Sequence, residues 1–394
     1  MEALRFSGLE VLVTDGSQRK ALAVVRSLGR KGACVITGEE TSAPVAAFSR
    51  YSSESLVYPS AAKNPARFHL FLDTFMRKRP LDALFPMDDA VCDSVTSALD
   101  AGWAPGTPVA LTPPEAYAVA RDKLRTYLLA EKRHVKYPAT DFPDGPAPAL
   151  KTAQRLGFPC VLRPRTTSGG RGLRLIATER DFQPAYEDVL RDYGPPLVQE
   201  FIPPGDRFDV CLLFDRAGSM RASFVQRELR NYPLDRGPST VQESAVRPDL
   251  VASAARLLGE TGWRSVAEVE YMVDRRHSRP VLMEVNPRFW ASTACAIASG
   301  VDFPALALLE ALGEPVPGSH AYLPGVRVRW LVPGGLLHAA ACLRAGCLPE
   351  PLPPAPGGER LDIFELGDPW PVAGVISQIA RHCLDREMWR KVIR

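Results

Sequence analysis

The chain has 394 residues, 46% of them hydrophobic and 24% charged, and its 48 Lys and Arg against 45 Asp and Glu give a formal net charge of +3. This composition excludes a disordered, collagenous or disulfide-scaffold protein, and the small net charge argues against nucleic-acid binding through bulk electrostatics. No apolar run reaches the roughly 20 residues that span a bilayer, and the N-terminus lacks a cleavable secretory pattern. We therefore expect a cytoplasmic protein of two or three domains that binds neither membranes nor nucleic acids.

The first part of the chain alternates short apolar runs with helical patterns. The runs are Leu9–Thr14, Ala33–Thr37, Leu81–Pro86 and Pro108–Thr112, and the helical patterns are Arg19–Arg30, Pro65–Lys78 and Asp89–Ala101. Such alternation predicts parallel strands joined by helices. The segment Thr14–Ser17 lacks the dinucleotide-binding glycine pattern, so a plain strand-to-helix turn is favoured there over a phosphate site.

A second part begins with Pro113–Lys132, which reads as one helix anchored by Leu124, Leu128 and Leu129. A proline-rich loop, Tyr137–Pro148, follows it, and from there to about Gly313 long strands and turns are expected. The eight cysteines show no C-x-x-C pair and no zinc spacing, which predicts reduced, mostly buried thiols rather than a zinc site or a cysteine nucleophile.

The C-terminal part is predicted to hold a rigid connector and a helix. The connector is Leu348–Gly358, and its prolines favour an extended form. The helix is amphipathic, with an apolar stripe of Val372, Val375, Ile376, Ile379, Cys383, Met388 and Trp389 opposite Arg381, Arg386, Arg390 and Lys391. Packing of this stripe onto the protein body is favoured, and binding to a membrane surface is the alternative.

An arginine and a glycine cluster form the first chemical signal. Phe158–Pro164 reads as a buried strand that presents Arg163, and Ser168-Gly169-Gly170-Arg171-Gly172 follows closely. Consecutive glycines allow backbone N–H groups to approach anionic oxygens. A phosphate cradle and a flexible hairpin turn explain this pattern about equally well.

Polar residues interrupt the next apolar strand, Leu197–Ile202. Gln199 and Glu200 would suit recognition of the edge of a nitrogen heterocycle, and an edge strand with solvated side chains explains them equally well.

Carboxylates on two neighbouring strands form the third signal. Strand alternation puts Glu268 and Glu270 on one face of Val266–Val273, and Glu284 and Asn286 share a face at the end of Val281–Val285. Such hard oxygen ligands suit Mg²⁺ together with substrate phosphates. The structural alternative is salt bridges with Arg264 or Arg279.

An arginine follows these ligands. Arg288 continues the Glu284-x-Asn286 spacing, and its guanidinium could clamp a phosphoryl group or a carboxylate. Two metal ligands and an anion clamp within five residues are the most specific pattern in the chain.

In order and spacing, ARDK around Lys123, VLRP around Arg163, SGGRG, VQEFIPPGD, VEY around Glu270 and MEVNPRFW resemble the ATP-grasp superfamily, and most of all its carbamoyl-phosphate-synthase-like carboxylate–amine ligases. The resemblance covers roughly residues 8–315. It implies an α/β fold with a Rossmann-like N-terminal domain (1–112), an α+β ATP-grasp unit of two subdomains (113–315) and a small C-terminal extension (316–394).

The resemblance also implies roles for individual residues. ATP would be bound by Lys123, Arg163, Ser168, Gly169, Gly170, Gly172, Gln199, Glu200, Ile202 and, near the ribose, Asp206. Alignment puts Arg207 near the ribose position, with Asp206 and Asp209 as its neighbours. Mg²⁺, or Mn²⁺ in its place, would be held by Glu270, Glu284 and Asn286, with Arg288 stabilising phosphoryl transfer and Arg227 or Arg230 holding a substrate carboxylate. Arg163 stands where relatives usually have Lys, and Gln199 where many have Glu.

The activity that the resemblance implies is ADP-forming ligation. A small-molecule carboxylate would become an acyl phosphate, which an amine then converts into an amide, and a homodimer is common in the family. The alternatives are carboxyphosphate or carbamate formation by the same fold, and a protein that binds ATP without chemistry.

Overall fold

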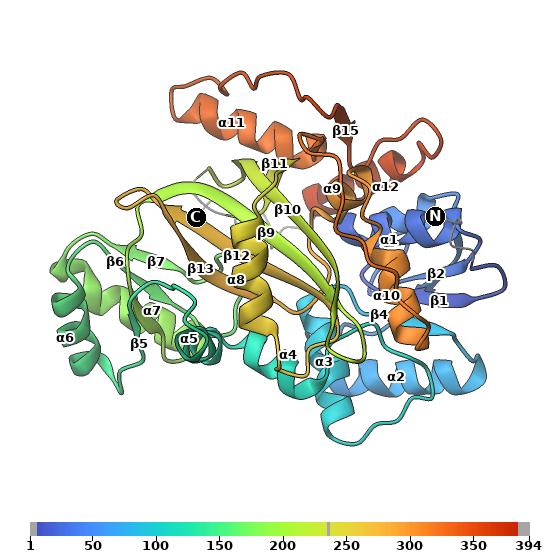
Figure 1. The fold of residues 1–394 in the computed structure, drawn as a ribbon, viewed down its shortest axis with the longest axis horizontal. Helices are drawn as coiled ribbons and strands as arrows, with labels where there is room; N and C mark the ends of the chain where they lie inside the picture. Colours follow the sequence, from blue (N-terminus) through green and yellow to red (C-terminus); the bar gives the residue numbers. More distant parts are fainter. Residues whose placement is uncertain (1–5, 235–236, 385–394) are drawn as a thin grey trace.

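The structure, a computed structural model, describes residues 6–234 and 237–384 and is built around three β-sheets (Figure 1). The N-terminal sheet lies at one end of the molecule, a small four-stranded sheet at the other, and a large antiparallel sheet between them. Among the described residues, none of the helices combines the length and the apolarity that crossing a bilayer requires.

The N-terminal sheet is parallel, with the strand order β3-β2-β1-β4. Its strands are β1 (Glu10–Val13), β2 (Cys34–Glu39), β3 (Ser52–Val57) and β4 (Ala83–Phe85), and its helices are α1 (Arg19–Arg30), α2 (Pro65–Lys78) and α3 (Asp89–Asp100). This confirms the predicted alternation. The run Pro108–Thr112 is no full strand, because it pairs with β4 only through a bridge between Leu84 and Val109.

The turn between β1 and α1 is closed by the protein itself. The Glu39 carboxylate accepts a hydrogen bond from the backbone N–H of Ser17 at 2.8 Å. Because this carboxylate occupies the start of α1, the structure agrees with a plain turn there.

The helix predicted over Pro113–Lys132 is wrong, because it breaks in two. The helices are α4 (Pro114–Arg121) and α5 (Lys123–Lys132), and between them Asp122 is extended and caps α5 by accepting from the N–H of Leu124. The break turns the helix so that Lys123 and Tyr127 are buried while the predicted anchor Leu128 is 57% exposed.

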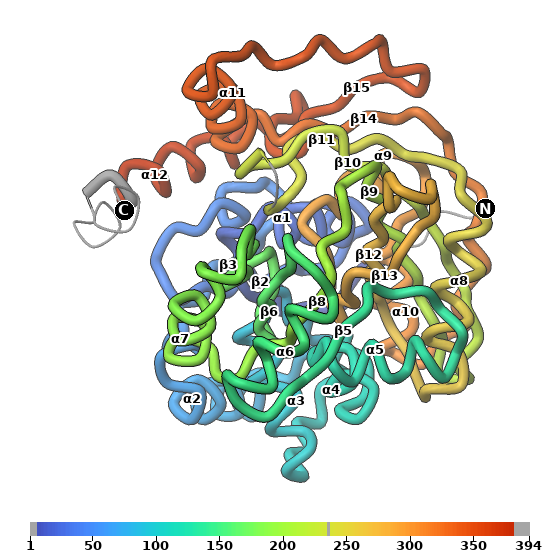
Figure 2. Tube along the Cα trace, turned by 90° about the vertical axis from the view of Figure 1, so that its left-hand side faces the viewer, coloured from blue at the N-terminus to red at the C-terminus, as the bar shows by residue number. Residues whose placement is uncertain are grey.

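The small sheet has the order β5-β8-β6-β7. Its strands are β5 (Thr140–Asp141), β6 (Cys160–Arg163), β7 (Arg174–Ile176) and β8 (Leu197–Glu200), so the expected loop Tyr137–Pro148 contains a short strand. The helices α6 (Pro146–Leu156) and α7 (Phe182–Tyr193) share an apolar core with it (Figure 2). Strand β6 therefore presents Arg163 from a rigid element.

The large sheet has the order β13-β12-β9-β10-β11-β14-β15. Its strands are β9 (Pro204–Phe214), β10 (Met220–Asn231), β11 (Ser239–Ser244), β12 (Ser265–Asp274), β13 (Arg279–Asn286), β14 (Arg327–Arg329) and β15 (Glu359–Leu361). Helix α8 (Pro248–Leu258) packs on one face. Helices α9 (Thr293–Ala298) and α10 (Phe303–Leu312) share a core with α1, which joins this sheet to the N-terminal domain.

The C-terminal part packs against both the large sheet and the N-terminal part of the chain. Strands β14 and β15 extend the large sheet, α11 (Leu336–Arg344) follows β14, and 348–358 connects α11 to β15 without helix or strand. Helix α12 (Pro371–Leu384) packs against the turn Val45–Phe48. Val375 is buried and Ile379 packs on the core, as predicted, but Ile376 is 62% exposed.

Several of the residues predicted for the terminal helix cannot be compared with the structure. Met388 and Trp389 of the apolar stripe, and the basic residues Arg386, Arg390 and Lys391, fall outside the described residues, and nothing is described of the Cys383 side chain. The seven cysteines with described side chains are free thiols, and all but Cys34 and Cys347 are buried, which agrees with the prediction. The domain boundaries near 112 and 315 stay predictions.

Candidate functional site

A cavity of about 800 Å³ lies between the small and the large sheet. Ten of the predicted site residues line it: Arg163, Gly169, Gly170, Gln199, Glu200, Ile202, Glu270, Glu284, Asn286 and Arg288. The structure thus brings together residues that are up to 125 positions apart in the chain, from Arg163 to Arg288.

A row of acidic side chains crosses the floor of the cavity. Glu284 on β13 pairs in register with Glu270 on β12, which in turn pairs with Asp209 on β9. One register step along, Asn286 pairs with Glu268, and its Nδ2 donates to Glu268 at 3.0 Å and to Glu270 at 2.8 Å. The predicted metal ligands therefore share one face of two adjacent antiparallel strands, as strand alternation requires.

Glu284 is in direct contact with two cations. Glu284 Oε2 lies 2.7 Å from Arg163 Nη2 and 3.3 Å from Lys123 Nζ. Burial raises the pKa of Glu284, but these two cations outweigh that effect and lower it to about 2. The alternative in which Arg264 or Arg279 neutralises these acids finds no support, because Arg163 and Lys123 occupy that role.

The remaining carboxylates repel one another. Burial, followed by the charges of Glu284 and Glu268, raises the pKa of Glu270 well above its usual range. Burial raises the pKa of Glu268 to about 7, although Arg288 acts in the opposite direction. Burial, with Glu228 and Glu268, also raises the pKa of Asp209. For these three acids, nearby cations do not outweigh the effect of burial, and such a cluster forms an environment that favours a further cation.

This donor set fits Mg²⁺. No group of three or more His, Cys, Asp or Glu in 6–234 and 237–384 is assembled as a complete metal site. Mg²⁺ does not need one, because it takes one or two protein carboxylates and completes its shell with phosphate oxygens and water. Glu270, Glu284 and Asn286 are the residues that would hold it.

The predicted phosphate-binding loop, 168–172, contacts the rest of the protein at its start and is open at its two central glycines. Gly169 and Gly170 have φ of +61° and +72° and open space around them, which leaves their backbone accessible from the cavity. Gly172 is needed for packing instead, since a Cβ there would lie 2.6 Å from the Tyr193 ring. Lys123 Nζ donates to the carbonyl of Thr167, so Lys123 contacts both the loop and Glu284.

The predicted adenine side of the cavity combines engaged polar groups with an apolar wall. Gln199 Nε2 donates to Tyr127 Oη at 3.1 Å and to Thr140 Oγ1 at 2.8 Å, so its head group is held by the protein. Glu200 accepts from the backbone N–H of Ala139. Ile202 packs with Met272, Val281 and Met283, an apolar cluster beside the cavity that the sequence reading missed.

Six predicted residues lie outside the cavity lining: Lys123, Ser168 and Gly172, and also Asp206, Arg227 and Arg230. Asp206 and Arg227 form an ion pair of 3.1 Å and are about half exposed. Arg230 donates to the backbone carbonyl of Glu350 in the C-terminal connector. Their proposed roles toward ribose and substrate stay predictions without support from this geometry.

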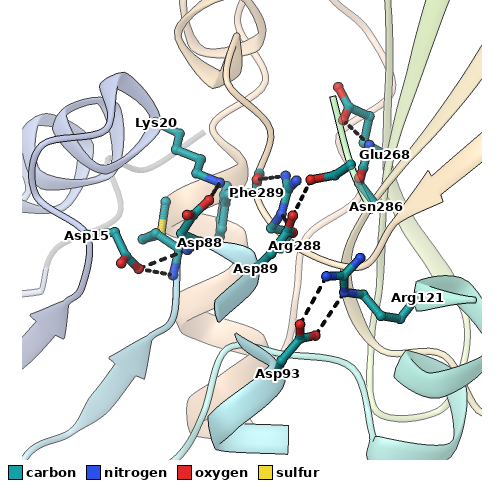
Figure 3. Close-up of polar contacts among 12 residues, drawn as sticks. Asp15, Lys20, Asp88, Asp89, Asp93, Arg121, Glu268, Asn286, Arg288 and Phe289 are labelled. Atoms are coloured by element: carbon teal, nitrogen blue, oxygen red, sulfur yellow. Dashed lines mark hydrogen bonds and ion pairs between the residues drawn. The ribbon is translucent and has the colours of Figure 1, made fainter. Parts of the chain in front are cut away.

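The structure adds residues that the sequence reading did not assign. Arg19 on α1 and Glu228 on β10 line the end of the cavity beside the β10–β11 hairpin, together with Arg207 on β9, which the resemblance had put near the ribose. Asp89, at the start of α3, pairs with Arg288 (Figure 3). It also accepts a hydrogen bond from Ser168 Oγ. The signal that could have indicated Asp89 is its place directly after a parallel strand, at the carboxyl edge where such folds gather functional groups.

The fold and this geometry define a class of protein. The structure is similar to a biotin carboxylase–nucleotide complex from Campylobacter jejuni, with a TM-score of 0.67 and 17% identity over 80% of this chain and 74% of that one. It is also similar to the biotin carboxylase domain dimer of 2-oxoglutarate carboxylase from Hydrogenobacter thermophilus, described in complex with MgADP and bicarbonate, with a TM-score of 0.65 and 17% identity over 79% and 71% of the two chains. The fold is that of the ATP-grasp enzymes.

The sequence places the chain more narrowly. Residues 138–318, somewhat less than half of the chain, match the family described as carbamoyl-phosphate synthase L chain, ATP binding domain, which agrees with the resemblance to the ATP-grasp superfamily. An acetyl-CoA carboxylase from Schizosaccharomyces pombe is 26% identical over 175 residues, which cover 42% of this chain and 8% of that protein. The chain thus corresponds to a small part of this relative's length.

Proposed function

We propose that this chain is an ATP-dependent, ADP-forming carboxylate–amine ligase that uses Mg²⁺. The observation that carries the proposal is the juxtaposition of Glu270, Glu284 and Asn286 on two paired strands with Arg288 at the same cavity. Lys123 and Arg163 lie beside them, and both contact the Glu284 carboxylate.

The chain's own residues would bind and orient ATP. The apolar cluster of Ile202, Met272, Val281 and Met283 offers a wall for the adenine ring. Lys123, Arg163 and the backbone of Gly169 and Gly170 would contact the phosphates. Bound Mg²⁺ supplies charge neutralisation of the phosphate oxygens during transfer.

The proposed reaction has two steps. An oxygen of the substrate carboxylate attacks the γ-phosphorus of ATP, the bond to the β–γ bridging oxygen breaks, and ADP leaves. The amine nitrogen then attacks the carbonyl carbon of the acyl phosphate, phosphate leaves, and the nitrogen loses a proton as the amide forms. Arg288 would hold the transferring group, and catalysis would come from positioning and charge rather than from a protein nucleophile.

A test of this proposal needs no knowledge of the natural amine. The purified chain would be incubated with MgATP, hydroxylamine as surrogate amine and a panel of carboxylates, and both ADP and hydroxamate would be measured. We expect equal amounts of the two products with at least one acid, and their loss in Arg288→Ala. Arg79→Ala, which removes a surface ion pair with Glu10 in the N-terminal domain, is the matched control.

A second candidate is the formation of carboxyphosphate from bicarbonate. It is favoured by the relative described with bicarbonate and MgADP. ADP formation that depends on bicarbonate, and on no organic acid, would support this candidate over the ligase. The cavity end formed by Arg19, Arg207 and Glu228 favours a larger substrate with charged groups.

We also propose that the chain forms a homodimer, since one similar biotin carboxylase domain is described as a dimer. Sedimentation equilibrium would show a particle of twice 43.1 kDa, and a monomer at all concentrations would contradict it.

A further inference from the structure

One carboxylate of the N-terminal domain touches two parts of the ATP-grasp unit at once. Asp89 is the first residue of α3, and its Oδ1 accepts from Nε of Arg288 (Figure 3). Its Oδ2 accepts from Oγ of Ser168. The three residues are separated by 79 and 199 positions in the chain. Asp89 therefore connects the proposed phosphoryl clamp with the proposed phosphate-covering loop.

This carboxylate is buried and charged. Asp89 is 8% exposed. Burial by itself raises the pKa of its carboxyl group, but the guanidinium of Arg288 and that of Arg121 lower it below its usual range. Both contacts of Asp89 are thus charge-assisted hydrogen bonds, which are stronger than hydrogen bonds between neutral groups.

The pairing fixes the direction of Arg288. Its Nε donates to Asp89 and its Nη1 donates to the backbone carbonyl of Phe289 at 3.1 Å. Within the described part of the chain Nη2 has no hydrogen-bond partner, and Arg288 lines the cavity. A guanidinium has five N–H groups, so the pairing with Asp89 leaves donors for an anion in the cavity.

The pairing also fixes the loop. The carbonyls of Thr166 and Thr167 accept from Arg121 and Lys123. Ser168 is the last residue before the two glycines with positive φ, and its bond to Asp89 is a side-chain contact of the loop with the N-terminal domain. Beyond it, no Cβ placed on Gly169 or Gly170 would touch a neighbour, so nothing packs closely against the loop there.

We propose that Asp89 is a positioning residue that aims Arg288 at the reacting anion and latches the loop 168–172 over the cavity. The N-terminal domain thereby takes part in closing the site. The role given to Arg288 rests on the proposed function, whereas the latch rests on the contacts of Asp89 and Ser168 alone.

The latch can be tested without any substrate. Arg171 lies exposed in the loop and is a trypsin cleavage site, so the rate of cleavage there, located by mass spectrometry, measures how often the loop opens. We expect Asp89→Asn to accelerate cleavage after Arg171 about tenfold or more, because it weakens the charged contact to Ser168.

A matched control is present in the same molecule. Asp368 is fully buried and also accepts from an arginine Nε and a serine Oγ, those of Arg26 at 2.8 Å and Ser49 at 2.6 Å, but it belongs to the C-terminal part and is not in the lining of the 800 Å³ cavity. Asp368→Asn should leave cleavage after Arg171 at the wild-type rate. Equal acceleration in both variants, or none in Asp89→Asn, would overturn the latch.

A second variant keeps the test valid if Asp89→Asn does not fold. Ser168→Ala removes only the loop side of the contact and should accelerate the same cleavage by a similar factor. The positioning of Arg288 is read separately: Asp89→Asn should lower kcat of ADP formation about tenfold or more with little change in KM for ATP, whereas Asp368→Asn should change neither. Absence of turnover in the wild-type chain would refute the proposed ligase and leave the cleavage result standing.

Discussion

Replacing Glu284 by Gln tests the ion cluster at the centre of the cavity. The substitution keeps the shape of the side chain and removes its charge, which leaves Arg163 and Lys123 buried with less compensation. Folding lowers the pKa of Glu284 from 4.5 to about 2, and at ~1.36 kcal/mol per unit this corresponds to about 3 kcal/mol of net stabilisation. Loss of one partner from a buried ion pair typically costs ~3–5 kcal/mol, which agrees.

The sign of the pH dependence follows from the lowered pKa. The contribution is fully present above the unfolded value near 4.5 and is lost as the pH falls from there toward about 2. Urea unfolding near pH 7 should therefore show Glu284→Gln to be less stable by about 3 kcal/mol, and the difference should shrink as the pH approaches ~3.

The control is a glutamate in an exposed ion pair. Glu54 on β3 is one of two carboxylates that pair with Arg79. Because the Glu54 side chain is 46% exposed, Glu54→Gln should lower the free energy of unfolding by at most about 1 kcal/mol. Equal stability of Glu284→Gln and wild type would refute the cluster as described. We also expect Glu284→Gln to lose Mg-dependent ADP formation, and normal turnover in a folded variant would refute its role as a metal ligand.

Three further predictions concern pH, packing and charge. Burial raises the pKa of Glu310 from 4.5 to about 7, so the stability of the wild-type protein should fall as the pH rises between these values. Near pH ~8, Glu310→Gln should be about 3 kcal/mol more stable than wild type. A wild-type stability that does not change with pH in this range would contradict this. Gly172→Ala should lower the melting temperature more than Gly170→Ala, because both need positive φ but only the former brings a Cβ to 2.6 Å from Tyr193; equal melting temperatures would refute the packing argument. Arg163→Lys should keep the charge and the nucleotide binding but lose about 1–3 kcal/mol of stability in urea unfolding, because Lys cannot reproduce the fork of hydrogen bonds, and unchanged stability would contradict it.

Local sequence patterns predicted the N-terminal elements well where apolar residues recur on one face that the fold buries. The helix Arg19–Arg30 and the helix Pro65–Lys78 have the predicted bounds, because each carries an apolar face that the sheet buries. Strand Ser52–Val57 was not predicted, since it is a mostly exposed edge strand with polar side chains. The break at Asp122 was missed because the residues on both sides of it are helical and the apolar pattern continues across it. Asp122 ends one helix and caps the next, so a different set of side chains in α5 becomes buried.

The acidic face of the site could be predicted, but its partners could not. Strand alternation puts Glu268 and Glu270 on one face of β12 and Glu284 and Asn286 on one face of β13, and the register of the two strands then pairs Glu270 with Glu284. The pairing of Asp89 with Arg288 depends on how two domains pack, and no local pattern carries that information. The same holds for Arg19, which enters the cavity from the N-terminal domain and pairs with Asp362 near the end of the chain at 3.0 Å.

The most direct test of the account is a calorimetric titration of the full chain with ATP, in the presence and absence of Mg²⁺. We predict saturable binding that is stronger with Mg²⁺, selective for adenine over other bases, and no longer strengthened by Mg²⁺ in Glu284→Gln. A folded chain that binds no ATP under either condition would contradict the assignment of this cavity as a nucleotide site.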